Sequence, residues 1–295
     1  MTGIEEILAL DETAPGRFRS APVPSELPRT FGGQVAAQSL VAAARTVDPA
    51  YTAHSSHGNF LAPGRPHEPA DHVVERLRDG GSFCTRRVTG IQAGDAVFTM
   101  TVSFHRGDEG FSHQAGMPDV PAPEEIAASD RATGRRVARL AEWREWDIRW
   151  VPRTAISRVP DAPACQRMWI RYGRPLPDDP VLHAGALTYL SDMALLRTSR
   201  LPHPERAVQG ASLDHSVWFL RPFRADEWLL YDQVSPSAEL GRALIRGRLF
   251  DRTGRLVAAA VKEGLMRYDR RRPDTGGSLE GGTTGGHTSG RVPAG

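Results

Sequence analysis

The amino-acid sequence predicts an α+β fold in which a unit of one long helix covered by an antiparallel β-sheet occurs twice. Two observations lead to this prediction. Segments 32–47 and 183–198 both have the length and apolar density of buried helices. Each is followed by a strand-like segment that ends in the same Phe-Leu-x-Pro pattern, at 60–63 and at 219–222. A repeat of this kind indicates two copies of one structural unit in a single chain.

The helices and strands of each unit follow from local signals. Asp48 and Pro49 end the first helix, and the second is expected to end before Pro202. Each half then closes with two strands around a turn, at 93–95 in the first half and at 252–254 in the second.

The strand predicted over 96–104 shows the clearest alternation. Its large apolar residues share one face and its hydroxyl-bearing residues share the other: Phe98, Met100, Val102 and Phe104 against Thr99, Thr101 and Ser103. Such a strand belongs to an antiparallel sheet with one covered face. The long helix of the same unit is the expected cover.

Composition divides the chain into four segments. Residues 1–115 and 147–268 are expected to form the two folded units. The Pro-, Gly- and charge-rich stretch 116–146 is expected to link them, with a short helix over 127–146. Segment 269–295 is rich in Gly, Ser, Thr and Pro and cannot bury enough surface to offset the entropy lost on ordering. We therefore expect a disordered tail there.

The overall composition excludes several classes of protein. The chain has 295 residues, 40% of them hydrophobic, which suits one large domain or two small ones. A net charge of +2, from 37 basic and 35 acidic residues, gives no electrostatic basis for binding nucleic acid or an anionic membrane. No apolar run approaches the roughly 18 residues of a membrane-spanning helix.

Two further features favour a cytoplasmic protein. Glu5 and Glu6 occupy the region in which a secretory signal would be positively charged. The two cysteines, Cys84 and Cys165, cannot build a disulfide framework.

Asp192 is the first candidate for a chemical role. It lies in the predicted second helix among apolar neighbours such as Leu190, Met193 and Leu195. A carboxylate in such surroundings is costly unless it is hydrogen-bonded or paired, and such groups gather at sites of chemistry. The alternative is that Asp192 points away from a one-sided helix and is simply solvated.

Lys262, the only lysine among the 37 basic residues, is the second candidate. When the two strand turns are aligned at their glycines, Lys262 takes the place of Val102, in the apolar phase of its strand. Its amine is then expected to point toward the covering helix, where Asp192 is the only acid over 187–196. The alternative is a lysine at a strand edge whose stem extends to water.

Other polar patterns do not predict familiar catalytic sites. Asp214, His215 and Ser216 have the residue types of a hydrolase triad, but consecutive strand residues alternate between faces and cannot converge. His54 and His57 alternate in the same way and are poor partners for a metal ion. The chain has no motif of a zinc protease, a phosphate-binding loop or a dinucleotide-binding loop. We therefore expect neither metal nor cofactor.

The triplet Gly32-Gly33-Gln34 begins the first predicted helix. The same triplet hydrolyses peptidyl-tRNA in release factors, but this chain lacks the basic RNA-binding domain which that role needs. Glycines permit close backbone approach, and a helix N-terminus offers N–H groups to an oxygen ligand. We therefore expect this triplet to bring backbone N–H groups close to an oxygen ligand, and not to act on peptidyl-tRNA.

Several longer segments resemble the acyl-CoA thioesterase II family. In the N-terminal half these are FGGQVAAQSL (31–40), HSSHGNFLAPG (54–64), ERLRDGGSFCTRRV (75–88) and MTVSFHRGDEGFSHQ (100–114). In the C-terminal half they are LTYLSDMALL (187–196), ASLDHSVWFLRPFRADEWLLYDQ (211–233) and VKEGLMR (261–267). The resemblance extends in order over residues 5–268.

This resemblance implies a double hotdog fold, in which two long helices are each wrapped by an antiparallel sheet and the two sheets join in a pseudo-dimer. It also implies hydrolysis of acyl-CoA to free fatty acid and CoA, without a metal, a cofactor or a covalent intermediate. The protein is expected to form a homo-oligomer, a dimer or a tetramer, and to act on medium or long acyl chains.

In this family an Asp, a Thr or Ser, and a Gln hold the attacking water, and the resemblance places them at Asp192, Ser212 and Lys262. Lys262 departs from the pattern, because an ammonium group only donates hydrogen bonds whereas an amide both donates and accepts. Substrate contacts are expected from Gly32, Gly33, Gln34 and His57.

The lysine leaves two functions open. Beside Asp192, the lysine stabilises the ionised carboxylate and so makes Asp192 a weaker general base, which would make the chain a slow or inactive acyl-CoA binder. The same ammonium can donate to the oxyanion, where one donor is typically worth about 10²–10³ in rate. An active thioesterase is therefore the leading hypothesis.

Two other functions rank below these. A hotdog dehydratase would use His54, His57 or His215, and an interaction scaffold would leave a buried Asp192 unexplained. The first helix has Leu40 where the second has Asp192, so we expect one acidic site per chain.

Overall fold

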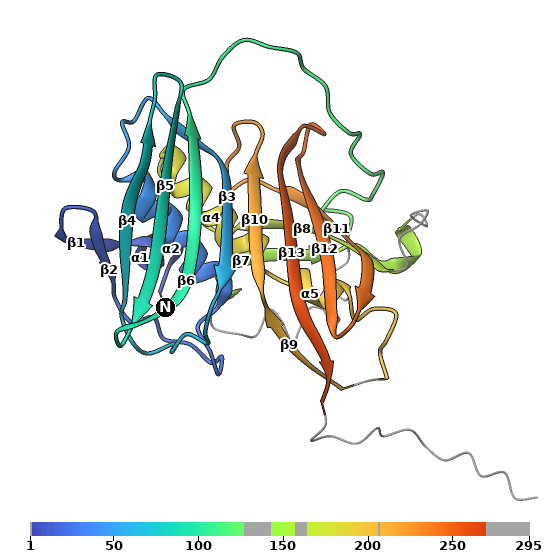
Figure 1. Cartoon of the computed structure of the whole chain (residues 1–295). Coiled ribbons are helices and arrows are strands. Elements are labelled where there is room, and N and C mark those ends of the chain that lie inside the picture. The colour runs from blue at the N-terminus through green and yellow to red at the C-terminus, as the bar shows by residue number, and fades with distance from the viewer. Residues whose placement is uncertain (1, 127–142, 157–163, 206, 270–295) are drawn as a thin grey trace, which may run out of the picture.

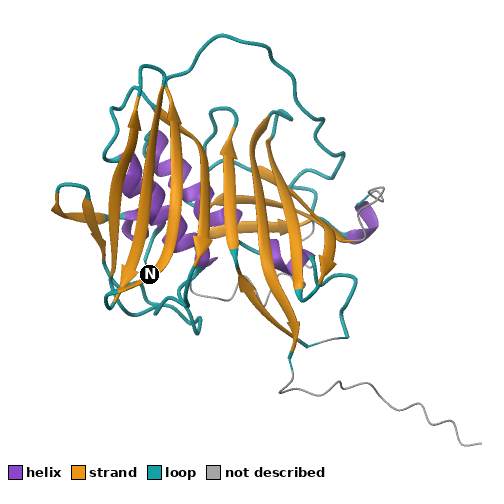
Figure 2. Cartoon of the chain, viewed as in Figure 1, coloured by secondary structure: helices purple, strands orange, loops and turns teal. Residues whose placement is uncertain are grey.

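The computed structural model describes residues 2–126, 143–156, 164–205 and 207–269. Its strands form one antiparallel sheet in the order β1-β2-β4-β5-β6-β3-β10-β13-β12-β11-β8-β7, and β9 also pairs with β13. The long helices lie behind this sheet (Figure 1; Figure 2). Most of the helix expected over 127–146, and nearly all of the expected tail, lie outside the described residues.

The N-terminal unit places its long helix before four sheet strands. Its elements are α1 (Ile4–Leu8), β1 (Leu10–Ala14), β2 (Arg17–Ser20), α2 (Gly32–Ala44), β3 (Thr52–Phe60), β4 (Ala70–Asp79), β5 (Phe83–Gln92) and β6 (Asp95–His105).

The C-terminal unit repeats this order, with two strands before its long helix and with a short helix and a short strand inserted after it. Its elements are β7 (Trp146–Trp150), the short 3₁₀ helix η3 (Arg153–Ala155), β8 (Ala164–Tyr172), α4 (Pro180–Ser191), α5 (Leu195–Thr198), β9 (Val208–Ser212), β10 (Asp214–Phe219), β11 (Leu229–Glu239), β12 (Arg242–Asp251) and β13 (Leu256–Tyr268).

Strands β3 and β10 join the two units. They pair in antiparallel register, with His57 opposite Ser216. The seam lies near the middle of the sheet, so the two halves share one continuous set of backbone hydrogen bonds (Figure 1). This is the joined arrangement that the resemblance implies.

Helices α2 and α4 pack side by side on the inner face of the sheet. Helix α2 contacts β4, β5 and β6, α4 contacts α2 and reaches β3 and β10, and α5 contacts β11, β12 and β13. The apolar residues of β6 lie under this layer, each no more than 1% exposed, as the alternation predicts: Phe98, Met100, Val102 and Phe104.

The second long helix differs from the prediction. One helix over 183–198 was expected, but α4 ends at Ser191 and α5 begins at Leu195. Ala194 between them has a left-handed backbone, with φ +58°, which a continuous helix does not allow. The carbonyls released by this break find side-chain donors: Gln166 Nε2 lies 3.0 Å from the Ala194 oxygen and Gln233 Nε2 lies 3.5 Å from that of Met193.

The outer face of the C-terminal sheet is also covered. Trp169 of β8, Leu230 of β11 and Phe250 of β12 form a buried cluster with Ile126 and Val151, which lie outside the sheet. This layer comes from residues 117–126 of the connecting segment and from residues 151–156, which follow β7.

Candidate active site

The break between α4 and α5 sets the position of Asp192. Asp192 is the C-terminal cap of α4, where the prediction placed it inside a continuous helix. It is nonetheless only 7% exposed, so its carboxylate is buried rather than solvated. A buried carboxylate needs partners, and two structural elements provide them.

The first partner of Asp192 comes from the other unit. The Gly33 N–H in the first turn of α2 donates to Asp192 Oδ2 over 2.9 Å. Glycine is required for this approach, because a Cβ at Gly33 would lie 2.5 Å from the Tyr189 carbonyl oxygen. The N-terminus of α2 thus meets the C-terminus of α4, and its unpaired N–H groups and positive dipole end stabilise the carboxylate.

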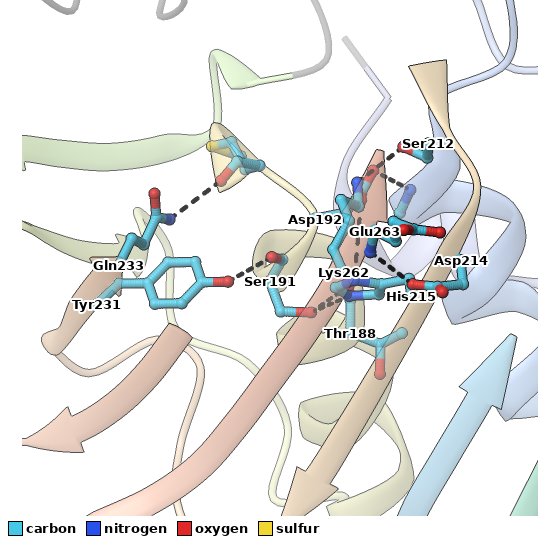
Figure 3. Close-up of polar contacts among 12 residues, drawn as sticks. Thr188, Ser191, Asp192, Ser212, Asp214, His215, Tyr231, Gln233, Lys262 and Glu263 are labelled. Atoms are coloured by element: carbon cyan, nitrogen blue, oxygen red, sulfur yellow. Dashed lines mark hydrogen bonds and ion pairs between the residues drawn. The ribbon is translucent and has the colours of Figure 1, made fainter. Parts of the chain in front are cut away.

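Lys262 is the second partner. It is 1% exposed on β13, and its Nζ contacts Asp192 Oδ1 in an ion pair. The same Nζ lies 2.8 Å from Ser212 Oγ on β9, which pairs with β13 (Figure 3). Burial lowers the pKa of the Lys262 ammonium to about 7, while the adjacent carboxylate favours the charged form.

The structure therefore brings Asp192, Ser212 and Lys262 together, although 20 and 50 residues separate successive members in the sequence. All three line one pocket of about 510 Å³. Apolar side chains form much of the remaining wall, among them Phe31, Phe60, Val97, Trp143 and Leu196. A carboxylate, a hydroxyl and an amine thus open onto a largely apolar cavity.

The expected substrate contacts are only partly at this pocket. Gly32 and Gln34 line it. The Gly33 N–H is directed to Asp192, not to a substrate carbonyl as expected, because the two helix ends meet at that point.

His57 is not at the pocket. It is exposed on β3, where successive residues alternate between faces, and its Nδ1 lies 3.1 Å from Ser216 Oγ on the outer side of the seam. We therefore leave His57 out of the site.

The sequence analysis missed the polar residues behind the site. His215 is fully buried, and its Nε2 lies 2.8 Å from Ser191 Oγ. Tyr231 donates to the Ser191 carbonyl over 2.6 Å. A signal for His215 was present, because it shares the apolar phase of its strand with Val217, which is also fully buried.

The residue triplet 214–216 does not form a triad. Asp214 accepts from the Glu263 N–H over 2.7 Å, and Ser216 contacts His57, so the two lie away from the buried His215. Within the described ranges, no three His, Cys, Asp or Glu side chains are grouped to bind a metal ion. None of the helices in the same ranges is long and apolar enough to cross a membrane.

Comparison with known proteins assigns the family. Residues 21–105 match a model of the acyl-CoA thioesterase N-terminal domain, and residues 142–265 match a model of acyl-CoA thioesterases. An acyl-CoA thioesterase II from Mycobacterium marinum has a crystal structure with a TM-score of 0.82 and 48% identity, covering 92% of this chain and 100% of that one. The chain belongs to the acyl-CoA thioesterase II family.

A more distant relative of the family is also similar. Acyl-coenzyme A thioesterase 8 of Mus musculus is 36% identical over 259 residues, which cover 81% of this chain and 80% of the mouse protein. A hotdog protein of unknown function from Alicyclobacillus acidocaldarius, 23% identical, superimposes with a TM-score of 0.73 over 90% of this chain and 98% of its own length. The fold is a double hotdog, as predicted.

Proposed function

We propose that this chain hydrolyses acyl-CoA thioesters to free fatty acid and CoA, with Asp192 as the general base. The observation that carries the proposal is the shared pocket of Asp192, Ser212 and Lys262. Membership of the acyl-CoA thioesterase II family supports the reaction class. The apolar wall of the pocket suits the medium or long acyl chains that we expect as substrates.

In the proposed mechanism, Asp192 orients a water molecule and accepts its proton as the water oxygen attacks the thioester carbonyl. The resulting tetrahedral intermediate collapses with cleavage of the C–S bond. The CoA sulfur then takes the proton from Asp192, which returns to the carboxylate form. No covalent link to the enzyme is needed.

Lys262 and Ser212 supply the hydrogen-bond donors in this mechanism. Because the Lys262 amine donates to Ser212 Oγ, the hydrogen of that hydroxyl remains available to the substrate side. We place the oxyanion against Ser212 and Lys262 and not against Gly33, whose N–H is directed to Asp192.

Release of CoA from a panel of acyl-CoAs tests the proposal in wild type and in Asp192→Asn, which keeps the shape of the side chain. Loss of a general base should lower kcat/KM by about 10²-fold or more. Asp11→Asn, at an exposed position on β1, is the control and should not change it. Unchanged turnover in Asp192→Asn would remove Asp192 from the mechanism.

A second candidate function is an acyl-CoA binder with little or no hydrolysis. The ion pair favours it, because Lys262 stabilises the carboxylate and so weakens Asp192 as a base. Binding of acyl-CoA without turnover in wild type, with hydrolysis gained in Lys262→Gln, would support this function. Loss of turnover in Lys262→Gln would instead support Lys262 as a donor in an active enzyme.

We also propose a homo-oligomer, a dimer or a tetramer, located in the cytoplasm. Family membership supports the homo-oligomer. Both cysteines, Cys84 and Cys165, are free, which fits a reducing compartment such as the cytoplasm. Light scattering on the purified protein measures the oligomeric state directly, and a monomer would contradict the proposal.

A further inference from the structure

In each unit a buried histidine contacts a serine of the long helix, although His72 lies on β4 and His215 on β10. His72 Nδ1 lies 3.1 Å from Ser39 Oγ, and His215 Nε2 lies 2.8 Å from Ser191 Oγ. Ser39 and Ser191 take equivalent places in the two long helices when Arg45-Thr46 is aligned with Arg197-Thr198. Both imidazoles are fully buried. The residue after the serine differs, because Leu40 follows Ser39 whereas Asp192 follows Ser191.

The contacts of Ser191 fix the proton on the His215 ring. Ser191 Oγ donates its only hydrogen to the Thr188 carbonyl oxygen, 2.9 Å away. Its oxygen must then accept from His215 Nε2–H. This tautomer leaves His215 Nδ1 with a lone pair and no proton. That atom is buried, has no hydrogen-bond partner among the described residues, and lies 4.0 Å from Asp192 Oδ1 (Figure 3).

Some groups around Asp192 stabilise its ionised form, and another stabilises its protonated form. Lys262 Nζ of β13 and the Gly33 N–H of α2 both donate, and both favour the ionised form. A neutral imidazole lone pair favours only the protonated form, because a carboxylate has no hydrogen to donate to it. His215 of β10, whose Nδ1 lies 4.0 Å from Asp192 Oδ1, acts in this second direction.

Charges near His215 do not change this division. Burial lowers the pKa of His215 to about 4, so the imidazole is neutral at the pH of a hydrolase assay. Asp214, the preceding residue, is held on the other face by the Glu263 N–H. Tyr231 of β11 meets the Ser191 carbonyl rather than the ring.

We propose that His215 is a positioning residue that accepts a hydrogen bond from Asp192 once the carboxylate has taken the proton of the attacking water. The inference rests on the proposed function. The distance between Asp192 Oδ1 and His215 Nδ1 is 4.0 Å, and shortening it by about 1 Å brings the two atoms into hydrogen-bond range. The bond stabilises protonated Asp192, raises the basicity of the carboxylate and offsets the effect of Lys262.

The test is the pH dependence of kcat/KM in His215→Phe, which removes the acceptor and keeps a planar ring. A hydrogen bond to one protonation form shifts a pKa by about one unit. We expect the acidic limb of the profile to move about one unit toward lower pH and the plateau to fall about 3- to 10-fold. His215→Gln, whose amide oxygen can accept the same hydrogen, should keep the limb near that of wild type.

His72→Phe is the matched control, because it breaks a similar buried His–Ser contact at a residue that does not line the pocket. It should leave the acidic limb in place. A lower plateau with an unmoved limb in His215→Phe, or an equal shift in His72→Phe, would overturn the proposal and reduce His215 to a structural role.

A second readout separates this inference from the proposed function. Carboxyl ¹³C NMR of aspartate-labelled protein measures the Asp192 pKa without turnover, and the Asp192→Asn variant identifies its resonance. We expect that pKa to be lower by about one unit in His215→Phe. A pKa equal to that of wild type would refute the role of His215 even if hydrolysis were observed. A lowered Asp192 pKa in His215→Phe, in a protein that does not hydrolyse acyl-CoA, would support the role of His215 and refute the proposed hydrolase function.

Discussion

The buried His72 should make the folded protein sensitive to acid. Burial lowers its pKa from 6.5 to about 4, because the desolvation of the imidazolium outweighs the attraction of the nearby Asp71 carboxylate. In the unfolded chain the same side chain titrates at its ordinary value. Between these two values the unfolded state binds more protons than the folded state, so the free energy of unfolding falls as the pH falls from 6.5 to 4.

The size of this effect follows from the shift. A difference of 2.5 pKa units amounts to about 3 kcal/mol when the pH has fallen below both values. At pH 5 about 2 kcal/mol of it is already lost relative to pH 7.5. Burial lowers the pKa of His215 to about 4 as well, so His215 should contribute a similar loss, which gives about 4 kcal/mol for the two histidines.

Urea unfolding at pH 7.5 and pH 5.0, in wild type and His72→Gln, measures the contribution of His72. The glutamine keeps a polar contact for Ser39 but does not titrate. The variant should lose about 2 kcal/mol less stability than wild type between the two pH values, while contributions from surface carboxylates cancel in the comparison. Equal losses in the two proteins would refute the reasoning.

Two further predictions concern the placement of Asp192. In Gly32→Ala the new Cβ would lie 2.9 Å from both Asp192 Oδ2 and the Phe60 ring, so we expect the carboxylate to shift and kcat to fall by about 10²-fold in the acyl-CoA assay. Gly81→Ala, whose Cβ meets nothing within 4 Å, should not change kcat. Gln166→Leu removes the donor to the Ala194 carbonyl and should lower the free energy of unfolding by about 1–3 kcal/mol in a urea titration.

Local periodicity was sufficient to predict most of the fold. The buried face of β6 alternates with a period of two, and the repeat around the Phe-Leu-x-Pro segments gave the order of helix and strands in both halves. Strand β8 has no such signal. It is buried on both faces, because Trp169 packs under the connecting segment, so its residues do not alternate between apolar and polar.

The break in the second helix depends on tertiary contacts that a local pattern cannot reveal. Residues 183–198 are mostly apolar and contain no proline, which predicts a single helix. The chain turns at Ala194 because Gln166 and Gln233, from strands distant in sequence, satisfy the carbonyls that the turn exposes. Sequence spacing alone therefore placed Asp192 six residues before the end of a helix, whereas it is the C-terminal cap of α4.

The central pair of the site was predictable for a different reason. Lys262 aligned with Val102 across the repeat, and both are buried on the same face of their strands. The approach of Gly33 was not predictable, because it depends on how two separately folded helices dock end to end.

The meeting of α2 with Asp192 has a consequence for how much substrate one polypeptide can process. The donor belongs to the first repeat and the acid to the second, and Leu40 fills the place where a reciprocal acid would stand. Two equivalent units would have formed two equivalent centres. Here tandem fusion permits a division of labour between the copies, and each polypeptide should turn over one acyl-CoA at a time.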